Sequence, residues 1–346
     1  MAYSFRSLLT SVQVLKKYKR ERLPDLDRAR GLAIFLVVLG HIVARHPPAG
    51  NDWYVILKSL IYMFHMPFFM FLAGFMLYYS YPVLRSWRDY RRYGVKKTGR
   101  LIVAFFIFST LIIAGKMLFK QAMVLDNAAA GWWEAFRLLL VFPPKSPAST
   151  LWFIYVLAVY YVVIPAAIFI VRDQIEYLLF PGLIVHFLPL SDHFALRLIA
   201  EYAFVFLVGM CAAKYRIRYM DLVDRYRFVW TGIFVCSFIL IFLGMPQGYC
   251  KFIIGLLSIP ALHALVRSEP LAQADVLSFL GVHSFSIYLM NTIVIGLVKG
   301  VILKFTSWDG THFIFIAPVL LASGLLIPIV LSNKVLSQTP VFKTVL

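Results

Sequence analysis

The chain has 346 residues, of which 61% are apolar and 14% are charged, whereas a soluble domain is about 45–50% apolar and about 25% charged. Long uncharged runs recur from one end to the other, which excludes a soluble protein with a single anchor and predicts an all-α, polytopic bundle of transmembrane helices. The 34 Lys and Arg residues outnumber the 16 Asp and Glu residues. In a membrane protein this excess belongs to cytoplasmic loops, and no nucleic-acid-binding motif accompanies it.

The apolar runs predict about ten spans of about 20 residues each. Between the third and fourth spans, residues 131–142 are too short to cross and are expected as an interfacial or re-entrant segment. The fifth span is short and contains Pro181. In chain order the expected spans cover residues 30–46, 54–80, 101–119, 151–171, 177–190, 194–213, 228–245, 249–266, 277–300 and 312–332.

The distribution of basic residues predicts that both termini are cytoplasmic. Basic loops are expected at residues 81–100 and 214–227, and an even number of spans places both loops on the N-terminal side. Without the fifth span the second loop would lie outside, against this rule. The expected division is a basic cytoplasmic segment at 1–24, a transmembrane domain at 25–333 and a cytoplasmic tail at 334–346.

Ionisable residues inside a membrane are costly to bury, so each is a candidate for function. Arg30 and His41 are eleven residues apart in the first span, which places them on one helix face and roughly 16 Å apart along the axis. An arginine fork binds phosphate and an imidazole takes a proton from a hydroxyl, so the pair suits a long anionic substrate such as acyl-coenzyme A. The alternative is that Arg30 only flanks the span and that His41 is a hydrogen-bonded packing residue.

Six segments form an ordered pattern along residues 25–330. The first reads DRARGLA from Asp27 and is followed by VVLGH, which ends at His41. The others are FHMPFF with FLAGF at 64–75, the basic residues 92–101, LWF at 151–153, FVFLVG at 204–209 and SFSIYL at 284–289. Together they resemble the acyltransferase-3 family of multispan O-acyltransferases, which modify cell-surface sugars. The family's Asp-x-x-Arg-Gly start and Arg-x10-His spacing both match this chain.

Two positions depart from the family pattern. Ala73 stands where serine is common, and Asn291 stands where histidine is frequent. An amide does not titrate in the physiological range, so a proton-transfer role at position 291 is in doubt, whereas the role of His41 is not affected.

The resemblance implies transfer of an acyl group, most simply acetyl, from acyl-coenzyme A to a hydroxyl of a surface or secreted polysaccharide or its lipid-linked precursor. Acyl-coenzyme A would be a donor substrate rather than a permanently bound cofactor, and no metal-binding spacing is found. The expected setting is a bacterial inner membrane, with lipids, the glycan acceptor and polysaccharide-assembly proteins as partners. Two alternatives stay open: a proton-coupled secondary transporter or exporter, and a non-catalytic membrane component of polysaccharide assembly.

Under this resemblance His41 is expected as general base or acyl carrier, and Arg30 is expected on the donor phosphates or the thioester carbonyl. His65 is expected near the acyl centre, or else as the partner of the helix carbonyl that Pro67 frees. Donor contacts are expected from Arg91, Arg92, Lys96, Arg100 and Trp152, acceptor contacts from Arg45, Ser286 and Asn291, and structural roles from Asp27, Gly74, Arg197 and Glu201.

Several of these residues have a second interpretation. The basic loop fits a solvated cytoplasmic face, Trp152 fits an interface anchor, and Arg45 fits a side chain that extends toward the membrane surface. Arg197 and Glu201 are four residues apart and are expected to form an internal ion pair, with a proton relay or an acceptor contact as the alternative. Three further histidines are expected in solvated outer loops: His186, His193 and His312.

Overall fold

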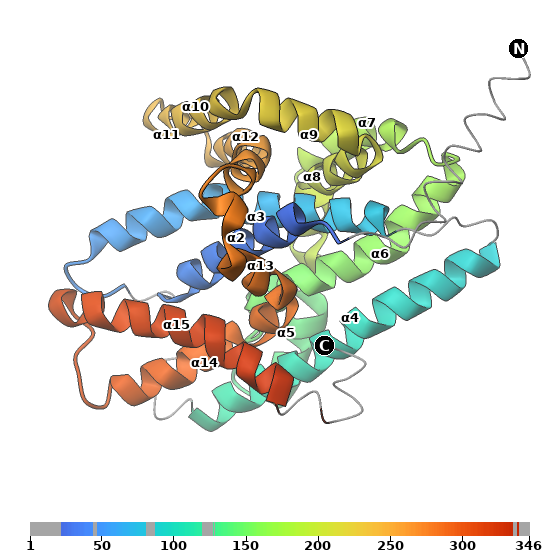
Figure 1. The fold of residues 1–346 in the computed structure, drawn as a ribbon. Coiled ribbons are helices and arrows are strands. Elements are labelled where there is room, and N and C mark those ends of the chain that lie inside the picture. The colour runs from blue at the N-terminus through green and yellow to red at the C-terminus, as the bar shows by residue number, and fades with distance from the viewer. Residues whose placement is uncertain are drawn as a thin grey trace, which may run out of the picture.

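The computed structural model describes residues 22–43, 47–80, 87–119, 127, 129–334 and 338, and within these ranges the chain is helical apart from its turns and connections (Figure 1). Seven helices of this described part are long and apolar enough to cross a membrane, and an eighth span is obtained if one bent pair is counted. The prediction of a helical polytopic membrane protein is therefore confirmed. The seven helices are α3 (Asp52–Tyr79), α4 (Trp87–Phe119), α6 (Trp152–Ile170), α8 (Leu196–Lys214), α12 (Gln247–Arg267), α14 (Ser284–Ile302) and α15 (Gly310–Lys334).

Shorter helices connect and cover these spans. The bent pair consists of α9 (Arg216–Arg225) and the helical stretch Arg227–Phe242 that follows it, with an angle of 76° between them. Three-residue and four-residue 3₁₀ turns precede α6, α7, α8 and α13. The remaining short helices are α5 (Trp132–Val141), α7 (Leu179–His186), α10 (Arg227–Ser237), α11 (Ile239–Phe242) and α13 (Asp275–Val282).

A polar helix, α2 (Pro24–His41), lies in the middle of the bundle (Figure 1). Pro24 begins it, as expected for a residue whose missing N–H would have no helical partner in the first turn. The helix packs against α3, α12, α13, α14 and α15, so much of its surface meets protein rather than lipid. Its buried apolar side chains include Leu26, Ala29, Ala33, Ile34 and Val38. Because it carries Asp25, Asp27, Arg28 and Arg30, it is not among the seven apolar helices.

Glycines allow two pairs of helices to touch through their backbones. A Cβ atom on Gly74 of α3 would lie 2.0 Å from the Phe206 carbonyl oxygen of α8, and one on Gly209 of α8 would lie 2.1 Å from the Phe71 oxygen of α3. The predicted packing role of Gly74 is therefore confirmed. The same reciprocal contact joins α2 to α13, where a Cβ on Gly31 would lie 1.9 Å from the Leu277 oxygen and one on Gly281 would lie 1.8 Å from the Asp27 oxygen.

Four expectations about the elements are wrong. The basic segment 81–100 is not a loop from residue 87 onward, because α4 begins at Trp87 and runs through it. The basic segment 214–227 is likewise helical from Arg216 to Arg225, where it forms α9. The segment expected as the fifth span forms a helix that ends at His186 and is too short to be counted as a span. Pro189 follows this helix closely and disfavours its continuation. The ninth span is divided at His283 into α13 and α14. The number of about ten spans and the sides of the two termini stay predictions.

Ionic contacts gather the ends of several helices at what we call the basic end of the bundle. Nη1 of Arg267, at the end of α12, lies 2.7 Å from Oδ2 of Asp25 at the start of α2. The same guanidinium donates from Nε to Oδ1 of Asp224 in α9 at 2.7 Å. Nζ of Lys214, at the end of α8, donates to the carbonyl oxygen of Asp173 at 2.9 Å. The start of α2 and the ends of α8 and α12 therefore lie on the same side.

Gly74→Ala is expected to destabilise the bundle by about 1–3 kcal/mol, because the added methyl group forces α3 and α8 apart. The measurement is the midpoint of thermal unfolding of the purified protein in one detergent. Gly232→Ala in α10 is the matched control, since no atom lies within 4 Å of its added Cβ. A Gly74→Ala protein as stable as the Gly232→Ala protein would contradict the close-packing argument.

Candidate functional site

The face of α2 that carries Arg30 and His41 is turned toward α14. Nη2 of Arg30 donates to Oγ of Ser284 at 2.8 Å. At the other end of α2, Nδ1 of His41 lies 2.8 Å from Oδ1 of Asn291. A single helix therefore meets both side chains, and the prediction that they share one face of α2 is confirmed.

The surroundings of Asn291 fix which nitrogen of His41 carries the proton. Nδ2 of Asn291 donates to the carbonyl oxygens of Ile287 and Tyr288, each at 2.9 Å. Both amide hydrogens are used in this way, so Oδ1 faces His41 and can only accept. The proton of the neutral imidazole consequently lies on Nδ1, and Nε2 keeps its lone pair. Asn291 thus orients His41 and leaves its other nitrogen free to act as a base.

His65 is a second, fully packed imidazole beside His41. Its Nδ1 lies 2.8 Å from the carbonyl oxygen of Ile61, which can only accept, so Nδ1 carries the proton here too. Tyr62 connects the two histidines: its ring centroid lies 4.8 Å from that of His65, and its hydroxyl donates to the carbonyl oxygen of Gly40 at 3.1 Å. Tyr62 thus lies between His65 and the residue that precedes His41.

His65 does not serve the carbonyl that Pro67 frees. A proline removes the hydrogen bond to the carbonyl four residues earlier, which is that of Met63. His65 bonds the carbonyl of Ile61 instead. The hydrogen bond of His65 therefore stays within α3, but it does not involve the carbonyl of Met63.

Arg30 lies among polar groups in the first half of α2, toward the basic end of the bundle. Its Nη1 is 3.7 Å from Oδ1 of Asp27, and Nε of Arg22 lies 2.5 Å from the second carboxylate oxygen of Asp27. The Arg30 side chain is 27% exposed, so its guanidinium is not sealed in the core. Asp27 therefore holds the position of Arg30, in agreement with the structural role expected for it.

Of the basic residues expected to bind the donor, Arg100 lies near Arg30. Its guanidinium is 5.6 Å from the ring centroid of Phe285, the residue that follows Ser284. Tyr161 of α6 interacts electrostatically with both Arg30 and Arg100. Arg91 is exposed on α4. Arg92 and Lys96 belong to α4, but their side chains lie outside the described part of the chain, as does the whole of Arg45.

The turn before α6 contacts α14 on both sides of Asn291. The Tyr288 hydroxyl donates to the carbonyl oxygen of Thr150 at 2.5 Å, and the Thr150 hydroxyl lies 3.4 Å from that of Thr292. Trp152 follows directly, and its ring stacks on Tyr202 with centroids 5.2 Å apart. Trp152 thus supports a wall made by α8.

Ser286 points to a different neighbour. Its hydroxyl lies 3.1 Å from that of Ser332 in α15. Ser284, two residues earlier and on the face toward α2, is the serine that meets Arg30.

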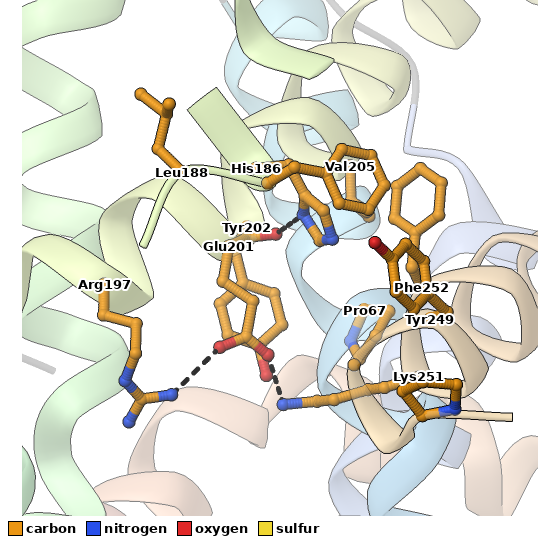
Figure 2. Close-up of a pocket in the computed structure, with 13 residues that line it drawn as sticks. Pro67, His186, Leu188, Arg197, Glu201, Tyr202, Val205, Tyr249, Lys251 and Phe252 are labelled. Atoms are coloured by element: carbon orange, nitrogen blue, oxygen red, sulfur yellow. Dashed lines mark hydrogen bonds and ion pairs between the residues drawn. The ribbon is translucent and has the colours of Figure 1, made fainter. Parts of the chain in front are cut away.

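A cavity of about 300 Å³, with a mostly apolar lining and a few charged groups, opens between α3, α7, α8 and α12 (Figure 2). Inside it Glu201 accepts a hydrogen bond from Lys251, and Nη1 of Arg197 lies 3.5 Å from the same carboxylate. The expected Arg197–Glu201 pair is therefore formed, but it is not internal, because the Arg197 side chain is 50% exposed. We call this cavity the Glu201 pocket; its lining includes Pro67, His186, Tyr202, Tyr249, Lys251 and Phe252.

The expectation for His186 is wrong, whereas His193 and His312 are exposed as expected. His186 is half-buried, its Nδ1 lies 2.6 Å from the carbonyl oxygen of Glu201, and its ring faces the pocket. Pro189 ends α7 early, which turns His186 toward α8 rather than into a longer outer loop.

Several residues of the site were not predicted from the sequence. Lys251 could have been found, since it is a charged residue within an apolar helix. Ser284, Thr150 and Tyr202 could not, because hydroxyl groups are common in spans and carry no signal of their own. Within the described residues, no group of three His, Cys, Asp or Glu side chains could hold a metal ion.

Comparison with known proteins gives one match. A family model described as an acyltransferase domain matches residues 23–333, nearly the whole chain. Neither a curated protein nor a solved structure matches the chain.

Nitrogen NMR of histidine-labelled protein in bilayers is expected to show His41 protonated on Nδ1 and unprotonated on Nε2. Asn291→Leu removes the acceptor and is expected to abolish this preference, since leucine offers no oxygen. Ser286→Ala, on the same helix but bonded to α15, is the matched control and should leave the His41 signal unchanged. A wild-type His41 protonated on Nε2 would contradict the assignment.

Proposed function

Because this chain belongs to the acyltransferase-3 family, we propose that it transfers an acyl group, acetyl in the simplest case, from acyl-coenzyme A to a glycan hydroxyl. Its apolar helices and its family make it a membrane acyltransferase. The identities of the donor and of the acceptor are part of our proposal and are not given by the family match. The observation that carries the proposal is the His41–Asn291 hydrogen bond, which leaves Nε2 of a partly buried imidazole as a base on the same face as Arg30.

The chemistry follows from that free lone pair. Nε2 of His41 removes the proton of the acceptor hydroxyl as its oxygen attacks the thioester carbonyl. The carbon–sulfur bond then breaks, and the departing coenzyme A thiolate takes the proton back from His41. An ester and free coenzyme A result. A two-step path, in which His41 first carries the acyl group, uses the same lone pair. Asn291 acts through His41 and is a positioning residue.

The basic end suits the donor. Arg30 carries a planar fork of donors that matches phosphate or the thioester carbonyl, and Arg100 lies near enough to share Tyr161 with it. Exposed basic residues of α4 extend the same positive region. Cytoplasmic segments of membrane proteins collect such residues, so we propose that this end faces the cytoplasm, where acyl-coenzyme A is found.

The remaining parts of the proposal follow from this orientation. The protein is proposed to lie in a bacterial inner membrane with about ten spans, α2 and the bent helix among them. Its acceptor is a surface or secreted polysaccharide or a lipid-linked precursor, handled alone or with polysaccharide-assembly proteins.

His41→Ala is expected to lower the rate of acyl transfer by about 100-fold or more, because general base catalysis contributes about that much. The measurement is transfer of radiolabelled acetyl from acetyl-coenzyme A to the glycan fraction of membranes that contain the protein. His312→Ala, an exposed histidine, is the matched control and should retain activity.

The same His41→Ala variant separates the proposal from its competitors. If the protein is a carrier, the wild type consumes no thioester and the His41→Ala variant has a lower transport flux. If it is an assembly scaffold, the variant changes neither acyl transfer nor transport. Unchanged acetyl transfer in His41→Ala would contradict the proposed function.

Arg30→Met is expected to raise the Michaelis constant for acyl-coenzyme A by about tenfold or more, since a hydrogen bond to a charged group is lost. Steady-state kinetics with varied donor measure this, and Arg30→Lys should recover part of the affinity through its charge. Arg225→Met removes an exposed charge elsewhere and controls for the general loss of positive potential. Equal effects of Arg30→Met and Arg225→Met would rule out a specific donor contact.

A further inference from the structure

We propose that the Glu201 pocket binds one neutral sugar ring of the acceptor glycan and presents its hydroxyl to His41 from the side away from Arg30. This rests on the proposed function and adds to it a place for the acceptor. The pocket is distinct from the Arg30 region, because its lining comes from α3, α7, α8 and α12 together with the turns beside them.

The lining combines the two features that hold a sugar. Tyr249 and Phe252 offer aromatic faces, on which the C–H groups of a pyranose ring can lie, whereas the Tyr202 ring is covered by Trp152 and Lys251. Glu201 offers a carboxylate held in place by Lys251 and Arg197, and its oxygens can accept hydrogen bonds from hydroxyl groups (Figure 2). An apolar wall with a few fixed polar groups is the usual make-up of a small-molecule site.

Each of the two cations in the lining of the pocket contacts a carboxylate, which favours a neutral ligand over phosphate or a carboxylate. One of these carboxylates, that of Asp192, also pairs with Lys145 at 3.3 Å. Lys251 lies against Glu201, and Arg197 donates from Nε to Asp192 at 2.7 Å besides its contact with Glu201. The hydrogen bond from Arg197 holds the pKa of Asp192 below its usual value, so this carboxylate stays charged at neutral pH. Both cations that line the pocket are therefore already opposed by a carboxylate.

The size and the rim of the pocket fit one ring of a longer chain. Its volume of about 300 Å³ is at the lower end of the range of about 300–1,000 Å³ for ligand sites. Arg197 and Tyr249 at the rim are both about half exposed, so a glycan held by one ring can continue into solvent.

The pocket lies on the His41 side of the bundle. Glu201 and Lys251 belong to the first turns of α8 and α12, opposite the ends of these helices that lie beside the start of α2, and His41 is the last residue of α2. Trp152 stacks behind Tyr202, from the segment that also bonds α14 next to Asn291. The acceptor would thus approach the imidazole from one end of the bundle and the donor from the other.

The test begins with binding to the purified full-length protein in lipid nanodiscs, measured by calorimetry. The probes are maltotriose, cellotriose and the N-acetylglucosamine trimer, with glucuronate and inorganic phosphate as anionic probes. At least one neutral trisaccharide is expected to bind the wild type. Glu201→Gln and Tyr249→Ala are each expected to weaken that binding by about tenfold.

Two matched controls exist outside the pocket. Glu176→Gln alters a Glu–Lys pair with Lys214, and Tyr177→Ala removes an exposed tyrosine that does not line the pocket. Both should bind the trisaccharide as the wild type does. Tyr249 is 52% exposed, so its truncation leaves the core intact even if Glu201→Gln folds poorly.

In the transfer assay, Tyr249→Ala should raise the Michaelis constant for the glycan and leave that for acetyl-coenzyme A unchanged. The pocket proposal is overturned if no trisaccharide binds the wild type, if both variants bind as tightly as the controls, or if phosphate or glucuronate binds more tightly than every neutral probe. Failure of the proposed function gives a different pattern: trisaccharide binding that depends on Glu201 and Tyr249, with acyl transfer that is absent or independent of His41.

Discussion

The hydrogen bond between His41 and Asn291 is the contact on which the arrangement of the site depends. It joins the end of a polar helix to the middle of α14, and its direction is set by two carbonyl groups of α14 that occupy both amide hydrogens of Asn291. Without that constraint an imidazole could turn either nitrogen away from α14. With it, only the unprotonated nitrogen is presented, so α14 defines the reactivity of a residue on α2.

Such a bond needs α2 to be held firmly inside the bundle despite its charges. The backbone contacts at Gly31 and Gly281 bring α13 against α2 as closely as two helices can pack. Arg267 binds Asp25 at the start of the helix, and Asp27 pairs with Arg30, so the charged first turns are neutralised locally. Close packing and ion pairing together allow a helix that would be poorly stable in lipid to lie at the centre.

The sequence predicts the features of this protein that depend on helical periodicity and on ionisable residues within apolar segments. The common face of Arg30 and His41 follows from their spacing, and the packing role of Gly74 follows from its place in an apolar span. The break at His283 was not predicted, because it depends on neighbouring helices. The helical form of the basic segment was not predicted either, because there α4 extends beyond the length needed to cross a membrane. Glu201 and Lys251 come together from α8 and α12, fifty residues apart, so no local pattern reveals that they share a cavity.

Asparagine at position 291 has a consequence for the environments in which this protein can work. Where two imidazoles face each other, acidification charges both and drives them apart, and the geometry of the pair then varies with the medium. An amide neither gains nor loses a proton over that range. The hydrogen bond from His41 therefore does not depend on the protonation state of its acceptor, and acidification changes this contact only by protonating the histidine itself.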